Sequence, residues 1–258
     1  MTVAAPGEQA TRTGAELCIR GLDVRYGGAR GVEALNGLDL DVASGSFHAV
    51  LGPSGCGKST LLRVLAGLLP KAGGSIEGAP ADIAYVPQGD SCMPWLTAED
   101  NVAFGLEARG MGKGERRTIA RHLLHTLGLD GFARRYPGEL SEGMRQRVAI
   151  ARAFALDTGL LLMDEPLSAL DFQTKVHVQD ELLGLWEARQ PTVLYVTHDI
   201  DEALALADRI TVLSERPANA RLTVEVPFER PRSYRHVRSQ PGYAELFGRL
   251  LETLEPPG

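Results

Sequence analysis

The chain has 258 residues, of which 44% are hydrophobic and 23% are charged. This balance is typical of a soluble globular protein, and the length allows one α/β domain with room for an inserted subdomain. The net charge of −6 argues against extensive nucleic-acid binding, because the phosphates of a nucleic acid would repel the chain. We therefore expect no nucleic-acid partner.

The cysteines and the hydropathy of the sequence indicate where in the cell the protein is located. Cys18, Cys56 and Cys92 show no C-x-x-C spacing and are odd in number, so they indicate neither a zinc site nor a disulfide framework. No apolar run approaches the ~18 residues that a membrane-spanning helix needs. Residues 1–15 lack the apolar core of a signal peptide, and we expect them to form a flexible tail. These patterns predict a reducing, cytoplasmic location.

Short strands dominate the beginning of the chain. Leu17 to Tyr26 and Leu38 to Val42 alternate between apolar and polar residues, with glycine-rich turns between them. This pattern predicts an antiparallel sheet that is separate from the rest of the fold. Phe47 to Leu51 then predicts a buried strand, and Ser59 to Ala66 predicts a helix.

The loop between that strand and helix carries the most informative motif in the chain. It reads G-x-x-x-x-G-K-S, with the residues Gly52, Pro53, Ser54, Gly55, Cys56, Gly57, Lys58 and Ser59, and Thr60 directly after. Glycines let consecutive N–H groups point at one anion, and the helix N-terminus adds positive potential. Lys58 supplies a cation for the β- and γ-phosphates, and the Ser59 hydroxyl can ligate Mg²⁺. The alternative is a plain glycine turn, but the flanking strand and helix favour binding of a nucleoside triphosphate.

Strand signals resume briefly and then stop in the middle of the chain. Ile83 to Val86 predicts a buried strand with Gln88 at its end. Next comes a capping-box-like start at Thr97-Ala98-Glu99-Asp100, with helical periodicity from Glu115 to Leu127 and from Met144 to Leu156. We expect a helical insertion over about residues 97–157.

Strands and helices alternate after this insertion. Strands are predicted over Leu160 to Met163, Thr192 to Val196 and Ile210 to Leu213, with a helix from Asp171 to Arg189. Such alternation predicts a mostly parallel sheet with right-handed crossovers. The fold class is therefore α/β: a P-loop NTPase core flanked by helices, with an N-terminal antiparallel β subdomain and an inserted α-helical subdomain. No internal repeat is visible, so we expect a single nucleotide-binding unit.

Two carboxylates follow the strand Leu160 to Met163. In a parallel sheet, the carboxyl end of a strand is where ligands bind. Asp164 can hold Mg²⁺, directly or through water, and Glu165 can act as the base that polarises an attacking water. The alternative is an ordinary strand end that meets solvent. The phosphate loop upstream and Pro166 directly after favour the functional interpretation.

A second loop carries the family resemblance. The segment from Leu140 to Arg147 reads L-S-E-G-M-R-Q-R and opens a helix, so Ser141 and Gly143 form a second anion-binding end. This segment resembles the signature loop of the ATP-binding-cassette ATPases, which reads roughly L-S-G-G-Q. The resemblance extends from about Tyr26 to His198, with several separated motifs in the order that the family shows.

The resemblance implies roles for four further residues. Tyr26 matches the aromatic residue that stacks on adenine, although it could be an ordinary strand tyrosine. Gln88 matches the glutamine that senses Mg²⁺ and the γ-phosphate, and His198 matches the histidine that contacts the γ-phosphate. Asp171 ends the segment Ser168-Ala169-Leu170-Asp171, which matches the loop that links the two sites of a dimer. The implied cofactors are ATP and Mg²⁺.

In this family two cassettes pair head to tail. The resemblance therefore implies that Ser141 and Gly143 contact the triphosphate held by Lys58 of a second copy, most simply in a homodimer. Two positions depart from the pattern: Glu142 replaces a glycine, and Met144 replaces the usual glutamine. Nitrate, sulfonate and taurine importers also read G-M here, so Met144 is expected. Glu142 either weakens ATP-driven closure or points into solvent.

Further segments resemble the same importer group. Met93 to Val102 is similar to its "L-P-W-L-T-V-x-D-N-V" segment, and Leu213 to Pro217 is similar to its "S-x-R-P" turn. The implied function is to drive an integral-membrane permease from the cytoplasmic face of the membrane. A periplasmic or lipid-anchored binding protein would deliver nitrate, a sulfonate, taurine or a similar solute. The alternative is a non-transport ATPase of the family, such as an iron–sulfur-assembly type.

These expectations divide the chain into a tail over residues 1–15, an ATPase domain over 16–230 and a C-terminal helical extension over 231–258.

Met93, Trp95 and Leu96 form an apolar cluster shortly before the helical insertion, and it allows two interpretations. Trp95 is either a core residue or part of a groove that receives a short cytoplasmic helix of the permease.

Overall fold

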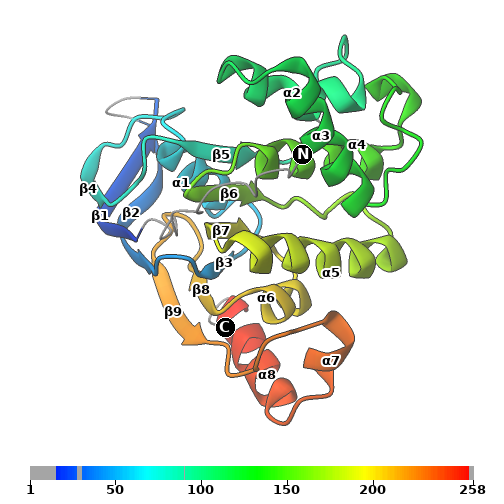
Figure 1. Cartoon of the computed structure of the whole chain (residues 1–258). Helices are drawn as coiled ribbons and strands as arrows, with labels where there is room; N and C mark the ends of the chain where they lie inside the picture. The colour runs from blue at the N-terminus through cyan, green and yellow to red at the C-terminus, as the bar shows by residue number, and fades with distance from the viewer. Residues whose placement is uncertain (1–15, 28–30, 90, 256–258) are drawn as a thin grey trace.

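A six-stranded sheet forms the centre of the protein. The computed structural model describes residues 16–27, 31–89 and 91–255. The sheet order is β5-β6-β7-β3-β8-β9, in which the strands from β5 to β8 are parallel and β9 is antiparallel (Figure 1). The strands are β3 (Phe47–Leu51), β5 (Ile83–Val86), β6 (Leu160–Asp164), β7 (Thr192–Val196), β8 (Arg209–Leu213) and β9 (Ala220–Glu225).

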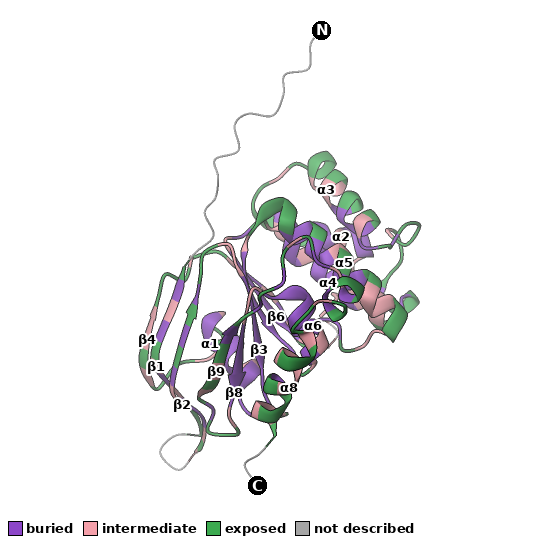
Figure 2. Ribbon diagram, turned by 90° about the horizontal axis from the view of Figure 1, so that it is seen from below, coloured by how far each residue is buried: buried purple, intermediate pink, exposed green. Residues whose placement is uncertain are grey.

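A smaller antiparallel sheet lies beside the central sheet, with helix α1 between the two (Figure 2). Its order is β2-β1-β4, with β1 (Leu17–Tyr26), β2 (Val32–Val42) and β4 (Gly73–Glu77). Helix α1 (Lys58–Leu65) buries Leu61 and Leu62 in one apolar cluster with residues of both sheets. Helix α1 therefore packs on the central sheet on one side and on the smaller sheet on the other, and this packing fixes the phosphate loop before it.

Alternation along the central strands creates two cores. Phe47 and Ala49 face a cluster that contains residues of the larger helices, whereas Val50 faces the cluster around α1. Successive side chains of a strand point to opposite faces, so one strand supplies both layers. Strand β6 behaves in the same way, with Leu161 in the first cluster and Leu162 in the second.

The helical insertion consists of α2 (Ala98–Ala108), α3 (Lys113–Thr126) and α4 (Glu142–Ala155), with a short 3₁₀ helix over Pro137–Glu139. Thr97 caps α2 by accepting a hydrogen bond from the Asp100 N–H at 3.2 Å. Asn101 is fully buried and holds the preceding turn: its amide donates to the carbonyls of Met93, Leu96 and Thr97, and its Oδ1 accepts from the Met93 N–H. The turn that carries Trp95 is thereby fixed to α2.

The last part of the chain packs around the end of the central sheet. Helix α5 (Phe172–Arg189) lies along the sheet, and α6 (Ile200–Leu206), α7 (Tyr234–Arg238) and α8 (Tyr243–Leu254) gather beside β8 (Figure 1). Tyr234 of α7 meets the exposed Phe172 ring edge-on at 5.7 Å. Within the described part of the chain, no helix combines the length and the apolar character needed to cross a bilayer.

The predicted fold class is confirmed, with its P-loop NTPase core, its separate antiparallel sheet and its inserted helices. Two strands were missed, β4 and β9. Strand β4 reads G-G-S-I-E, and glycine has low strand propensity, whereas β9 is a largely exposed edge strand. The predicted helices begin or end one or two residues away from the observed bounds, as helix ends often do. The predicted tail lies outside the described residues, and the division at residue 230 stays a prediction.

Gly74 offers a test of the small sheet. Its φ is +80°, and a Cβ there would lie 2.3 Å from the Gly21 carbonyl oxygen. The Arg20 carbonyl oxygen would lie at 2.6 Å, and because these neighbours are backbone atoms, we expect Gly74→Ala to lower the free energy of unfolding by at least about 2 kcal/mol. Urea unfolding followed by circular dichroism measures this change.

Gly114→Ala is the matched control. Gly114 lies inside α3, is exposed and has no heavy atom within 4 Å of its added Cβ. Alanine there should raise stability by up to about 1 kcal/mol, because it has the higher helix propensity. Equal stability of the two variants would contradict the assignment of Gly74 to a close backbone crossing.

Candidate active site

The phosphate loop lies between β3 and α1, with a backbone that only glycine allows at one position. Gly57 has a φ of +128°, and a Cβ on it would lie 2.9 Å from Leu35 Cδ2 and 3.0 Å from the Ala34 carbonyl oxygen. Gly57 is also the N-cap of α1, and it has no side chain that could satisfy the first N–H groups of the helix. The loop therefore offers backbone donors to an anion, as the sequence predicts.

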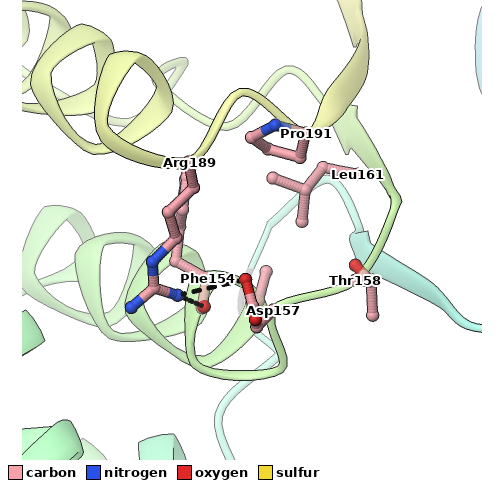
Figure 3. A pocket seen from close by; sticks show the side chains of 7 residues that line it. Phe154, Asp157, Thr158, Leu161, Arg189 and Pro191 are labelled. Atoms are coloured by element: carbon pink, nitrogen blue, oxygen red, sulfur yellow. Dashed lines mark hydrogen bonds and ion pairs between the residues drawn. The ribbon is translucent and has the colours of Figure 1, made fainter. Parts of the chain in front are cut away.

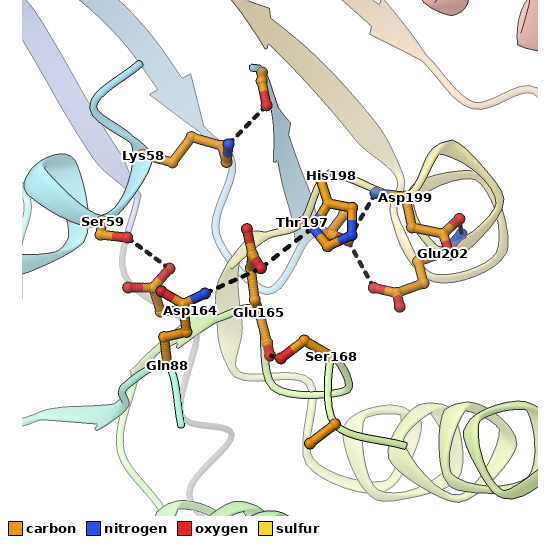
Figure 4. Close-up of polar contacts among 12 residues, drawn as sticks. Lys58, Ser59, Gln88, Asp164, Glu165, Ser168, Thr197, His198, Asp199 and Glu202 are labelled. Carbon is orange, nitrogen blue, oxygen red and sulfur yellow. Dashed lines mark hydrogen bonds and ion pairs between the residues drawn. The ribbon is translucent and has the colours of Figure 1, made fainter. Parts of the chain in front are cut away.

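Lys58 folds back across this loop. Its side chain is buried, and its Nζ donates to the carbonyls of Gly52 at 2.6 Å and Pro53 at 2.9 Å (Figure 4). Both acceptors are neutral carbonyls, and Lys58 is only 5% exposed. An oxyanion placed over the loop would meet an ammonium that is already desolvated.

Ser59 and Asp164 form the second part of the site. The Ser59 hydroxyl donates to Asp164 Oδ1 at 3.0 Å, and the Tyr85 hydroxyl donates to Oδ2 at 3.4 Å. Asp164 is 1% exposed. Burial raises the pKa of its carboxyl, the neighbouring Glu165 raises it further, and the Ser59 hydrogen bond lowers it in part. Tyr85 was missed by the sequence analysis, because only the pairing of β5 with β6 brings it beside Asp164.

These two residues fit a magnesium ion. A hydroxyl and a buried carboxylate are hard oxygen ligands, and a cation would offset the burial of the Asp164 charge. Within the described ranges, no three His, Cys, Asp or Glu side chains cluster as a protein metal site. Phosphate oxygens and waters would have to complete the coordination, which is the usual arrangement for Mg²⁺.

Glu165 joins the ends of three strands. Its Oε2 accepts from Gln88 Nε2 at 3.3 Å and lies 3.2 Å from His198 Nδ1 (Figure 4). Gln88 follows β5, Glu165 follows β6, and His198 follows β7. The Glu165 side chain is 16% exposed, whereas that of His198 is 60% exposed. The structure thus brings together the three polar residues that the sequence predicts at separate strand ends.

The backbone of Glu165 is unusual for a residue that is not glycine. Its φ is +47°, in the left-handed region. The conformation is held because its N–H donates to the Val196 carbonyl at 3.0 Å, and its own carbonyl accepts from the Ser168 N–H and hydroxyl. Such strain costs of the order of 1–3 kcal/mol and is concentrated at functional sites. It turns the carboxylate toward Gln88 and His198.

The signature loop does not join this cluster in the described parts of the chain. Ser141 caps α4 by accepting from the Met144 N–H at 3.3 Å. A Cβ on Gly143 would lie 2.5 Å from Leu170 Cδ2, so the loop packs closely on the turn after β6. No hydrogen bond or ion pair among the described residues links Ser141 or Gly143 to the phosphate loop.

Asp171 and Tyr26 both have structural partners. Asp171 is the N-cap of α5 and accepts from the N–H groups of Gln173 and Thr174, each at 3.1 Å. Hydrogen bonds from Thr174 and then Gln173 lower the pKa of its carboxyl. Tyr26 is 37% exposed and shares a 2.9 Å hydrogen bond with the Thr60 hydroxyl. This bond ties Tyr26 to the first turn of α1, beside the phosphate loop.

Glu142 and Trp95 are both at the surface. Glu142 is the first residue of α4 and is exposed, while the Arg145 guanidinium donates to the Leu140 carbonyl at 2.6 Å and the Pro137 carbonyl at 3.4 Å. Trp95 is 72% exposed. The interpretation of Trp95 as a core residue is therefore wrong, because the turn held by Asn101 directs the indole outward.

A small cavity lies at the opposite edge of the sheet. It has a volume of about 10 Å³ and is lined by Phe154, Asp157, Thr158, Leu161, Arg189 and others (Figure 3). Arg189 closes it by donating to the Phe154 carbonyl at 2.7 Å. Space for one water at most excludes a ligand site there.

Comparisons with known proteins agree with this geometry. A model of the family described as "ABC transporter" matches residues 35–168. The taurine import ATP-binding protein TauB of Burkholderia pseudomallei is 42% identical over 254 residues, which cover 93% of this chain and 97% of TauB. The nitrate import ATP-binding protein NrtD of Synechococcus elongatus is 42% identical over 231 residues, which cover 86% of this chain and 84% of NrtD.

The fold is also similar to that of a solved ATP-binding cassette. The dimeric, post-hydrolysis structure of the ATP-binding cassette MJ0796 bound to ADP and Pi has a TM-score of 0.74 and 30% identity. The matched region covers 83% of the present chain and 100% of the MJ0796 chain. The predicted resemblance to the nitrate, sulfonate and taurine importer group is confirmed, and the chain is an ATPase. This chain belongs to the ABC transporter family.

Proposed function

We propose that this chain is the ATP-hydrolysing subunit of an importer for a small solute such as taurine, a sulfonate or nitrate. It binds Mg-ATP between its phosphate loop and the signature loop of a second copy, and it drives a membrane permease. The printed functions of two relatives support the importer assignment, since one is named for taurine import and the other for nitrate import. The proposal names a class of solutes and no single one, because a cassette subunit of an importer drives the permease and does not bind the solute itself.

One observation carries the chemistry. Gln88, Glu165 and His198 converge at one edge of the sheet, with Glu165 Oε2 within 3.3 Å of the other two side chains. A water held by Gln88 and Glu165 would be aimed at the γ-phosphate, and Glu165 would accept its proton. His198 would donate a hydrogen bond to the phosphate. Mg²⁺ held by Ser59 and Asp164, near Gln88, would supply positive charge to the β- and γ-phosphates.

The signature loop supports a site shared between two copies. Ser141 and Gly143 lie at the N-terminus of α4, which offers positive potential to an anion. Among the described residues, no hydrogen bond links them to the phosphate loop of their own chain, which supports a site in which a second subunit brings its nucleotide to them. Tyr26 would stack on the adenine, and Asp171 would lie where the two copies meet. The dimeric state of MJ0796 supports this arrangement.

Exposed aromatic residues on and directly before the helical insertion support permease docking. Trp95, Phe104, Phe132 and Tyr136 are 72%, 45%, 39% and 50% exposed. The start of α2 and the segment that contains Phe132 and Tyr136 are joined, because the N–H groups of Ala98 and Glu99 donate to the carbonyls of Arg135 and Ala133. Exposed aromatic residues on a rigid frame are typical of docking sites. A cytoplasmic helix of the permease would occupy this surface, which would make the chain peripheral to the membrane and only indirectly linked to a solute-binding protein.

The first prediction concerns hydrolysis. Lys58→Ala removes the principal cation of the loop, so ATP binding should be lost. Glu165→Gln keeps the size of the side chain but removes the base, so ATP binding and dimer closure should persist while turnover falls by about 100-fold or more. Nucleotide binding and phosphate release are measured on the same preparations. Turnover of Glu165→Gln near that of the parent chain would contradict the role of Glu165.

The second prediction concerns docking. Trp95→Ala should reduce co-purification with the permease while leaving the thermal unfolding of the free subunit within about 2 °C of the parent, because an exposed side chain contributes little to the fold. Leu68→Ala is the matched control, since Leu68 is 67% exposed but follows α1, outside the helical insertion. Permease binding by Trp95→Ala equal to that of the parent and of the control variant would contradict docking at Trp95, whereas no permease binding by the parent would favour the non-transport ATPase.

The third prediction concerns Glu142. A carboxylate ~6 Å from a phosphate, at an effective dielectric of ~20, would be repelled by roughly 3 kcal/mol per unit charge before screening. An outward-pointing Glu142 avoids this repulsion, and the Ser141 hydroxyl and Gly143 N–H remain as donors. We therefore expect Glu142→Gly to change the ATP concentration needed for dimer closure by less than about tenfold, or 1.4 kcal/mol. A much larger tightening would mean that the carboxylate faces the nucleotide and acts as a brake.

A further inference from the structure

A buried polar network lies directly behind His198. The hydroxyls of Tyr195 and Thr197 both donate to Glu202 Oε2, at 2.9 and 2.7 Å. Tyr195 is fully buried, and Thr197 and Glu202 are 2% and 3% exposed. Two hydroxyls converging on one buried carboxylate oxygen form a rigid arrangement, because a buried carboxylate requires its donors.

Lys175 of α5 supplies the countercharge. Its Nζ forms ion pairs with Glu202 Oε1 and, at 2.8 Å, with Asp199 Oδ2. Burial by itself lowers the pKa of Lys175, but the carboxylates of Glu202 and Asp199 outweigh burial and raise it. The lysine is therefore charged, and it offsets negative charge of the Glu202 and Asp199 carboxylates beside it.

This network holds both neighbours of His198. The Thr197 N–H donates to the Val50 carbonyl of β3 at 3.2 Å, and the Thr197 hydroxyl accepts from the Asp199 N–H at 3.0 Å. Asp199 in turn caps α6 by accepting from the Glu202 N–H at 3.2 Å. The His198 ring itself is 60% exposed and lies against Glu165 (Figure 4). The orientation of the ring therefore depends on the backbone on either side of it.

Lys175 also connects this backbone to the turn after β6. It lies one helical turn into α5, and its N–H donates to the Asp171 carbonyl at 2.8 Å. Asp171 ends that turn, which packs on Gly143 through Leu170. The same lysine thus joins the start of α5 to the start of α6, which follows His198.

We propose that Lys175 and Glu202 are positioning residues for His198, which they hold toward Glu165 through Thr197 and Asp199. The inference rests on the proposed function, because it takes His198 as a contact of the γ-phosphate. Neither residue touches the nucleotide. Removal of the ion pair frees the backbone around His198, so ATP still binds to the loop of Lys58 but reaches the hydrolytic arrangement less often.

The test compares kcat and KM for ATP in the full chain, corrected for the folded fraction. Lys175→Met should lower kcat about tenfold or more with KM changed less than about twofold, and Lys175→Arg should restore most of the activity, because it keeps the charge. Glu202→Gln should act in the same direction and serves if Lys175→Met fails to fold. A fall in stability without a fall in corrected kcat would overturn the proposal.

Asp208→Asn is the matched control for loss of an ion pair. Arg230 pairs with Asp208 at 2.8 Å, and their side chains are 21% and 31% exposed, close to the 19% and 32% of Lys175 and Asp199. Asp208 lies before β8, at the opposite end of α6 from His198. This variant should lose stability but keep its corrected kcat. An equal fall in kcat would mean that any lost ion pair has this effect, which would overturn the proposal.

A double variant separates this inference from the proposed function. If Lys175 acts through His198, then Lys175→Met added to His198→Ala should cause less than about twofold further loss of kcat. A full multiplicative loss would overturn the positioning role while leaving the role of His198 intact. If His198→Ala alone leaves kcat unchanged, the proposed role of His198 fails, and the positioning inference fails with it.

Discussion

Strand β6 pairs with β5 on one side and β7 on the other, and this parallel register sets the level at which Gln88, Glu165 and His198 of the proposed hydrolysis centre follow their strands. Met163 pairs with Val86, and Asp164 pairs with Val196. The strands therefore end at the same level, and the first residues beyond them project from one edge. Because β7 also pairs with β3, the phosphate loop begins at that edge as well. A shift of register by one residue would turn the side chains of Asp164 and its neighbours to opposite faces.

The site at this edge is costly to fold. Lys58 and Asp164 are ionisable groups that are almost fully buried, and Glu165 has a strained backbone. Their free-energy cost is offset elsewhere, by two apolar clusters that share the central strands and bury them from both sides. The arrangement is preorganised: Ser59, Gln88 and His198 already contact the carboxylates that a nucleotide would approach. Little reorganisation of these side chains would then be required when ATP and the proposed Mg²⁺ bind.

The start of α4 is the part of the molecule that we propose to face the nucleotide of a second copy. Ser141 opens α4 in the helical insertion, and Gly143 packs on Leu170 next to the turn that ends at Asp171. The same insertion presents Trp95 to solvent on a turn fixed by the buried Asn101. One subdomain therefore joins the surface proposed for the second copy to the surface proposed for the permease. The network of Lys175 and Glu202 gives the core a comparable link between the start of α5 and His198.

Local chemistry determined what the sequence could predict by itself. The spacing of Gly52, Gly57, Lys58 and Ser59 specifies a phosphate loop, because the backbone conformation and the cation are set within one short segment. The alternation of strands and helices predicts the α/β core for the same reason. Gln88, Glu165 and His198 could be placed at strand ends, but only as separate candidates, and the family resemblance supplied their roles.

Only the tertiary structure decided which of these residues meet. The contact of Tyr85 with Asp164 and the ion pair of Lys175 with Glu202 join segments whose proximity depends on sheet order and helix packing, which no local pattern encodes. The same holds for Trp95, whose apolar neighbours suit either a core or a surface until Asn101 is seen to hold its turn outward. It holds also for Glu165, because its left-handed backbone is maintained by the Val196 carbonyl of the neighbouring strand.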